Sequence, residues 1–93
     1  MRRLVWTNTF VRAYKRFSRR HPQLLEKLQR VLEQLSVDPF QTQLRTHKLR
    51  GELEGVWACW IERDIRLLFE FVTAEDGGEE ILLLTLGSHD EVY

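Results

Sequence analysis

Apolar residues in the first half of the chain recur at the spacing of two helices. The first stripe follows three residues that favour helix N-caps, Thr7-Asn8-Thr9, and the second lies between Pro22 and Asp38. So few residues separate the stripes that the two helices are predicted to pack as an antiparallel hairpin. The stripes consist of Phe10, Ala13, Tyr14 and Phe17, and of Leu24, Leu25, Leu28, Val31, Leu32 and Leu35.

Shorter apolar segments elsewhere have the length and composition of strands. The segment 65–72 alternates between a fully apolar face and a mixed face, whereas the last segment is an unbroken apolar run. Polar turn residues separate the last three segments, and residues 40–55, which show no strong periodicity, are predicted to form a loop. The predicted strands cover residues 2–6, 56–61, 65–72 and 81–86.

The order of these elements predicts the architecture. An N-terminal strand, an antiparallel helical hairpin and a three-strand antiparallel meander form an α+β domain with the helices packed on one face of the sheet. Ninety-three residues suffice for a single domain, residues 1–93, and the apolar content of 43% for one modest core. No segment reaches the roughly 18 to 20 apolar residues of a membrane span, so the chain is expected in the cytoplasm without membrane contact.

Charge is divided unevenly between the two halves of the chain, although the net charge is zero. Residues 1–50 hold twelve Lys and Arg against three acids, and residues 51–93 hold two arginines against eleven acids. The basic half suggests contact with a polyanion. The alternative is that the two halves neutralise each other when the chain folds.

The sequence offers little for a metal or redox site. Its only cysteine, Cys59, has no partner for a disulfide within the chain and lies among apolar residues, so it is predicted to be in the core. The three histidines, at positions 21, 47 and 89, lack HxxxH or HxH spacing, and neither a metal nor another cofactor is expected.

Residues with varied chemistry are concentrated directly after the last predicted strand. Gly87 can adopt a positive φ and is expected to turn the chain out of the sheet. The chain then ends with His89-Asp90-Glu91-Val92-Tyr93, which supplies an imidazole, two acids and a phenol. Because histidine titrates near neutral pH, this segment is predicted to carry part of an active site.

Arg66 is the unusual residue of the strand 65–72, because it is charged among apolar neighbours. It follows Asp64 by two residues, so strand alternation predicts that both side chains point to the same side. Arg66 is either part of a structural ion pair or a fork for a phosphate or another planar anion.

The antiparallel meander is expected to bring several of these residues to one edge of the sheet. Two imidazoles, a carboxylate, an arginine and a basic rim are what metal-free RNA cleavage requires, since a base, an acid and a cation must surround one phosphate. The residues predicted to converge are His47, Asp64, Arg66, His89 and Tyr93, with Arg45, Lys48 and Arg50 in the basic loop around His47.

Three segments in this order resemble the RelE/ParE superfamily of bacterial toxins, in particular its YafQ-like mRNA interferases. They are residues 44–57, 64–69 and 86–93, and the helical hairpin fits the same pattern, so the resemblance covers nearly the whole chain. It implies a RelE-like fold and the toxin of a type II toxin–antitoxin system, an endoribonuclease that enters the ribosomal A site and cleaves mRNA there. It further implies a cognate antitoxin as partner, and contact with operator DNA only through the toxin–antitoxin complex.

The resemblance also implies a role for each candidate residue. His89 matches the principal proton donor, and His47 and Asp64 match further acid–base positions. Arg66 matches the arginine that stabilises the scissile phosphate, and Tyr93 matches a terminal aromatic residue that stacks on or orients a base. The residues that would hold the RNA backbone are Arg45, Lys48 and Arg50.

One position departs from the family pattern, and two other functions stay open. Some YafQ-like enzymes have a histidine where this chain has Trp60, which cannot transfer a proton but can stack on a base. A ParE-type toxin that binds and inhibits DNA gyrase without catalysis would share the fold, as would a basic module that only binds a protein or rRNA. The pair His47 and His89 favours the nuclease, because the ParE type does not need it.

Overall fold

The alternating segment of the second half becomes the central strand of the sheet. The computed structural model describes residues 1–93, in which β4 (Ile65–Thr73) pairs antiparallel with β3 (Trp57–Glu62) on one side and with β5 (Glu79–Ser88) on the other. Gly77, with φ of 87°, lies in the polar turn between β4 and β5. The predicted three-strand antiparallel meander is therefore confirmed.

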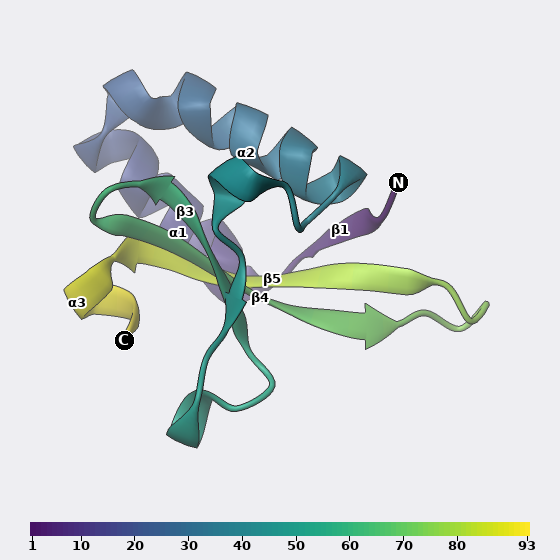
Figure 1. The fold of residues 1–93 in the computed structure, drawn as a ribbon. Helices are drawn as coiled ribbons and strands as arrows, with labels where there is room; N and C mark the ends of the chain where they lie inside the picture. Colours follow the sequence, from purple (N-terminus) through teal and green to yellow (C-terminus); the bar gives the residue numbers. More distant parts are fainter.

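Two short strands complete the sheet, whose order is β1-β5-β4-β3-β2 (Figure 1). β1 (Arg3–Trp6) is the predicted N-terminal strand and runs parallel to β5. β2 (His47–Lys48) pairs antiparallel with β3 and lies within residues 40–55, for which the sequence predicts a loop. A strand of two residues is too short to leave a periodic pattern. The same region holds two 3-10 turns, η2 (Thr42–Leu44) and η3 (Gly51–Leu53).

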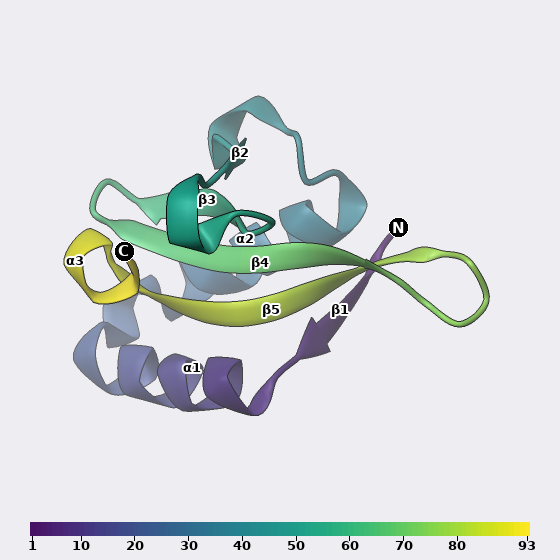
Figure 2. The ribbon, with the colours of Figure 1, turned by 90° about the horizontal axis from the view of Figure 1, so that it is seen from below.

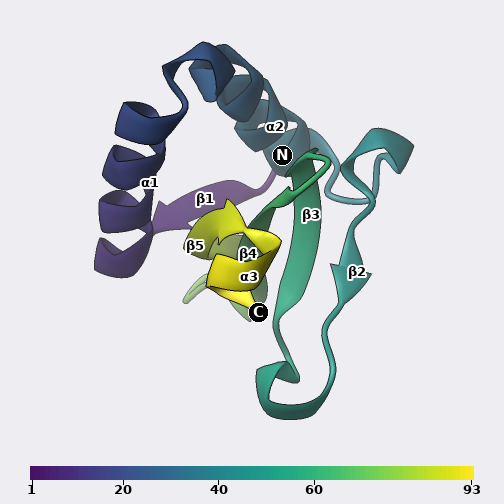
Figure 3. The ribbon, with the colours of Figure 1, turned by 90° about the vertical axis from the view of Figure 1, so that its left-hand side faces the viewer.

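Both predicted helices form, and both cover the same face of the sheet. The Thr7 hydroxyl oxygen accepts a hydrogen bond from the backbone N–H of Phe10 at 3.1 Å and so caps α1 (Asn8–Arg20). Pro22 starts a 3-10 turn, η1 (Pro22–Leu24), so α2 (Leu25–Val37) begins three residues later than the proline. From this turn α1 lies over β5 and α2 lies over β3, as Figure 3 shows.

The core fills the space between the helices and this face of the sheet. Cys59 is completely buried there, as predicted, and burial raises the pKa of its thiol to about 12, so it carries no thiolate at neutral pH. Strand alternation turns the residues between the core positions to the other face, which we call the open face (Figure 2). The open face carries Ala58, Trp60, Arg66, Leu68 and Glu70.

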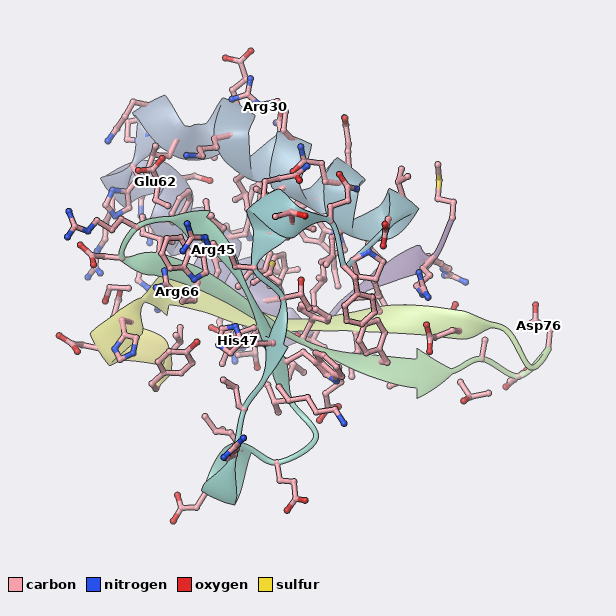
Figure 4. All side chains as sticks on the ribbon, viewed as in Figure 1. Arg30, Arg45, His47, Glu62, Arg66 and Asp76 are labelled. Atoms are coloured by element: carbon pink, nitrogen blue, oxygen red, sulfur yellow. The ribbon has the colours of Figure 1, made fainter.

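Folding brings the basic and acidic halves of the chain together. The ion pairs between them are Arg2–Glu79, Arg3–Glu80, Arg16–Glu91, Arg20–Glu91 and Lys27–Glu62. Mutual neutralisation therefore accounts for part of the uneven charge. The acidic turn around Asp76 lies at the far end of the β4–β5 hairpin from Arg66 (Figure 4). No helix in the chain combines the length and the apolar character that crossing a bilayer requires.

Replacing Leu28 by alanine should destabilise the fold strongly, because this side chain of α2 is fully buried. We expect the free energy of unfolding to fall by about 2–5 kcal/mol, as for other buried leucines. Gln29→Ala, on the exposed side of the same helix, should change it by no more than about 0.5 kcal/mol. Urea unfolding of both variants tests this, and equal losses would contradict the assigned core.

Candidate functional site

The Arg66 side chain is held against the turn between β3 and β4. Its Nη1 atom donates to the carbonyl oxygens of Glu62, Arg63 and Ile65, at 3.0, 2.8 and 3.3 Å. No carboxylate lies within ion-pair distance of Arg66, so the alternative of a structural ion pair is wrong. A guanidinium has five N–H donors, and Nη1 has two of them. Of the three on Nε and Nη2, one is within hydrogen-bond reach of the Tyr93 phenol, so at least two remain for a ligand.

Trp60 lies beside Arg66 on the open face and binds two guanidinium groups. The Cζ atoms of Arg45 and Arg66 each lie over the Trp60 ring, both 4.1 Å from the centroid. These are cation–π contacts, which hold both cations close together despite their mutual repulsion. The position where the family resemblance implies a histidine thus carries a platform for two arginines, an arrangement that the sequence did not indicate.

Arg45 reaches this platform from an unusual backbone conformation. Its φ of 50° and ψ of 40° place it in the left-handed region, and it is the only residue other than glycine with a positive φ. Its carbonyl oxygen also lies 2.9 Å from Nδ1 of His47, and because a carbonyl can only accept, Nδ1 is the donor. The other ring nitrogen of neutral His47, Nε2, is left free to accept a proton.

His47 lies on the open face, one strand away from Trp60. It pairs with Ala58 across the β2–β3 ladder, so its side chain points to the same side as those of Ala58 and Trp60 (Figure 4). Lys48 points to the other side, where its Nζ lies 5.4 Å from the centre of the Trp57 ring. Together with His47 and Arg50, Lys48 lines a cavity of about 920 Å³ beside β2, and Arg45 is not part of that lining. The predicted basic loop is therefore divided between two surfaces.

The end of β5 differs from the prediction at Gly87. This residue stays in the strand, opposite Arg66, and its φ is not positive. The chain leaves the sheet one residue later, where Ser88 caps the short helix α3 (His89–Val92). A Cβ atom at position 87 would lie 3.1 Å from Oε1 of Glu91, so a larger residue would have to displace the Glu91 side chain by a few tenths of an ångström.

Glu91 fixes α3 against the rest of the molecule. Its Oε1 accepts the backbone N–H of Ser88 at 2.9 Å, while the Ser88 hydroxyl accepts the N–H of Glu91 at 3.3 Å, which together form a capping box. Its Oε2 lies 3.0 Å from Nη1 of Arg20 and 3.9 Å from Nε of Arg16, both on α1. The hydrogen bonds from Ser88, and then the charges of the two arginines, lower the pKa of Glu91.

This anchored helix places His89 and Tyr93 next to Arg66. The two rings meet edge to face, with centroids 4.4 Å apart, and the backbone N–H of His89 donates to the Asp64 carbonyl oxygen at 2.9 Å. Burial raises the pKa of the Tyr93 phenol, and the charge of neighbouring Arg66 opposes that rise. Arg66, Tyr93 and His89 therefore form one continuous group, which we call the C-terminal cluster.

Asp64 is near the C-terminal cluster but is not placed as strand alternation predicts. Because β4 begins at Ile65, Asp64 belongs to the preceding turn, and only its backbone carbonyl contacts His89. Its carboxylate is exposed and has no hydrogen-bond or ion-pair partner. The C-terminal cluster itself is an open surface rather than a pocket, since the larger cavities lie elsewhere.

Comparison with known families and structures gives a consistent result. A family model described as the bacterial toxin of a type II toxin–antitoxin system, YafQ, matches residues 2–93. Among curated protein sequences none matches this chain significantly.

Several solved toxin structures share the fold. The structure of YafQ from E. coli strain BL21(DE3) is 18% identical and covers 100% of this chain and 99% of its own, with a TM-score of 0.81. A YoeB/ParE toxin from Agrobacterium tumefaciens is 20% identical, covers 94% of this chain and 98% of its own, and has a TM-score of 0.76. The toxin in the E. coli DinJ–YafQ complex is 18% identical, covers 99% and 97%, and has a TM-score of 0.78.

Removing the charge of Glu91 should loosen α3 in a pH-dependent way. Glu91→Gln keeps the size and the capping oxygen but loses the attraction to Arg16 and Arg20. Since the folded state lowers the pKa of Glu91, the carboxylate stabilises the fold above the unfolded carboxyl pKa of about 4.3, and this contribution disappears as the pH falls through the lowered pKa. The thermal midpoint of the variant should thus lie below that of the wild type at pH 7 and approach it in acid.

Glu75→Gln, at the exposed β4–β5 turn, is the matched control and should follow the wild type at every pH. A difference between Glu91→Gln and the wild type that stays constant from pH 7 to acid would show that the carboxylate charge is not what holds α3.

Proposed function

The chain belongs to the YafQ family of toxins of bacterial type II toxin–antitoxin systems, and we propose that it is a ribosome-dependent endoribonuclease that cleaves mRNA by acid–base chemistry. The observation that carries the proposal is the C-terminal cluster on the open face, with His47 on the same face two strands away from Arg66. This arrangement combines free guanidinium donors for a phosphate with two imidazoles that can exchange protons.

In the proposed reaction the 2′-oxygen of a ribose attacks the adjacent phosphorus, and the bond between phosphorus and the 5′-oxygen breaks. The 2′-hydroxyl proton passes to a base, and protonated His89 gives a proton to the leaving 5′-oxygen. The products are a 2′,3′-cyclic phosphate and a 5′-hydroxyl. His47 suits the base because Nδ1 already donates to the Arg45 carbonyl, which leaves Nε2 as the acceptor. The unpaired carboxylate of Asp64 is the alternative base.

Arg66 and Tyr93 would hold the reacting phosphate and the adjoining base. The free donors of Arg66 can stabilise the negative charge that builds up on the phosphate oxygens in the transition state. Tyr93 is 42% exposed, so its ring offers a surface on which a base can stack. Because Trp60 is already occupied by two guanidinium groups, we assign base stacking to Tyr93 and the placement of Arg66 to Trp60.

The openness of the C-terminal cluster supports dependence on the ribosome. Hydrogen bonds and charges stabilise a transition state weakly where water competes with them, and His89 has 58% of its side chain exposed. Binding in the ribosomal A site would cover the open face and hold the mRNA against it. The free chain would then cleave RNA slowly.

We further infer that a cognate antitoxin inhibits this chain. The structure of the DinJ–YafQ complex, whose toxin shares the fold, supports this inference. An antitoxin that covers the open face or displaces α3 would prevent the reaction.

His89→Ala should abolish most of the activity without unfolding the protein. Loss of a proton-transfer group typically reduces a rate about 10²–10⁴-fold, and the largely exposed ring contributes little to the core. The measurement is the rate of mRNA cleavage on programmed ribosomes, with thermal unfolding as the test of folding. His21→Ala, which removes an imidazole from the α1–α2 connection, should cleave at the wild-type rate.

The same preparations distinguish the nuclease from a gyrase inhibitor. Wild-type protein should leave DNA supercoiling by gyrase unchanged while it cleaves mRNA on ribosomes. Retention of full toxicity by His89→Ala, together with inhibition of supercoiling, would contradict the nuclease and favour the ParE type.

Arg66→Ala should reduce the cleavage rate about 10²–10³-fold, as loss of one transition-state donor does in other enzymes. Arg66→Lys keeps the positive charge but loses the planar fork and part of the stacking on Trp60, so it should recover only a fraction of the rate. Single-turnover cleavage on ribosomes separates this effect from binding. A wild-type rate for Arg66→Ala would remove Arg66 from the site.

A further inference from the structure

A second basic feature lies on the other side of Trp60 from the C-terminal cluster. It is a cavity of about 640 Å³ between α2, η2 and the end of β3, and we call it the α2–β3 pocket. This volume is in the range of known ligand sites. The polar residues that matter for its chemistry are Lys27, Arg30, Gln34, Arg45, Glu62 and Arg63.

The charges around the α2–β3 pocket do not cancel. Its one acid, Glu62, is paired with Lys27. Arg30, Arg45 and Arg63 form no ion pair, although the rest of the basic half finds several acidic partners on folding. Arg30 is exposed on the side of α2 away from the sheet, and Arg45 lies beside Arg66 (Figure 4). Three guanidinium groups without a carboxylate are therefore presented by three separate elements.

The backbone of Arg45 connects the α2–β3 pocket to the C-terminal cluster. A residue with a Cβ atom adopts the left-handed conformation at an energetic cost, and such strain is found where a side chain must be held in a particular place. Here the strained residue both lines the pocket and stacks on the indole that also carries Arg66. The Arg66 and Arg45 guanidinium groups each lie 4.1 Å from the centroid of the same Trp60 ring. A polyanion bound at Arg66 can therefore extend past Trp60 to Arg45 and from there to the pocket.

We propose that the α2–β3 pocket binds a phosphate of RNA next to the linkage held at Arg66, an inference that rests on the proposed function. Planar guanidinium groups bind phosphate oxygens in pairs, and the Gln34 amide, which forms no side-chain hydrogen bond, adds a neutral donor. The phosphate comes either from the mRNA or from the ribosomal RNA around the A site. A path of phosphates thus leads from the C-terminal cluster over Trp60 toward α2.

The test uses a double variant, Arg30→Gln with Arg63→Gln, which removes two pocket charges and leaves Arg45 and the C-terminal cluster unchanged. Arg12→Gln with Arg19→Gln is the matched control, since both residues are exposed on α1, form no ion pair and carry the same charge. Binding is measured by fluorescence anisotropy over a range of salt concentrations to single-stranded 2′-O-methyl RNA, which cannot be cleaved. Parallel measurements use ribosomes with and without an mRNA codon in the A site.

The pocket variant should bind about tenfold more weakly than the wild type, as expected for removal of charge-assisted hydrogen bonds. Its plot of log affinity against log salt should be shallower by about 0.7 for each phosphate that the variant no longer neutralises. The control should stay within about twofold of the wild type. Weaker binding to free RNA and to ribosomes with an A-site codon only would assign the phosphate to mRNA. Equal weakening on ribosomes with and without the codon would assign it to rRNA.

Equal weakening by the pocket variant and the control in all three measurements would overturn the proposal, because it would show a general charge effect. Wild-type binding of the RNA and of both ribosome preparations by the pocket variant would also overturn it. Because the RNA cannot be cleaved, these outcomes do not depend on catalysis. Failure of the proposed function would appear separately, as unchanged cleavage by His89→Ala.

Discussion

The alternation of side chains along β4 is the constraint on which the rest of the structure depends. Ile65, Leu67 and Phe69 are buried under the two helices, so the residues between them must face the other way. That constraint moves Arg66 to the open face without any cost of burying a charge. It also places Arg66 opposite Gly87 and beside Trp60, because the neighbouring strands are held in register by the same apolar face.

The candidate site is built by local anchors on that face rather than by a deep cavity. The carboxylate of Glu91 fastens α3 to α1, and the Trp60 ring holds Arg45 and Arg66 together. Neither anchor is buried, so both are weaker than core packing and sensitive to salt. In the proposed reaction, a large partner would exclude the water that this open surface admits. This agrees with a proposed reaction on the ribosome and with inhibition by a protein that covers the open face.

Several features of the site are accessible from the sequence, and others are not. The motif Ser88-x-x-Glu91 is a capping-box pattern. It is enough to predict that a helix starts after Ser88 and that the Glu91 side chain caps it. The stacking of Arg45 on Trp60 has no local signal, because it joins the end of a 3-10 turn to a strand fifteen positions later. Strand alternation does not determine the direction of Asp64, because β4 starts only at the next residue and Asp64 lies in the turn before it.

Local pattern is sufficient for the order of the two long helices and the four longer strands, for the buried faces and for the type of chemistry near the C-terminus. These follow from periodicity and residue type, since a period of 2 or 3.6 dictates which side chains share a face. Which polar residues meet is settled only when the chain folds, because such contacts join distant segments through the register of the sheet and the packing of α1 against β5. The C-terminal cluster, the division of Arg45 from Lys48 and the α2–β3 pocket are of this kind. No pattern along the chain predicts them.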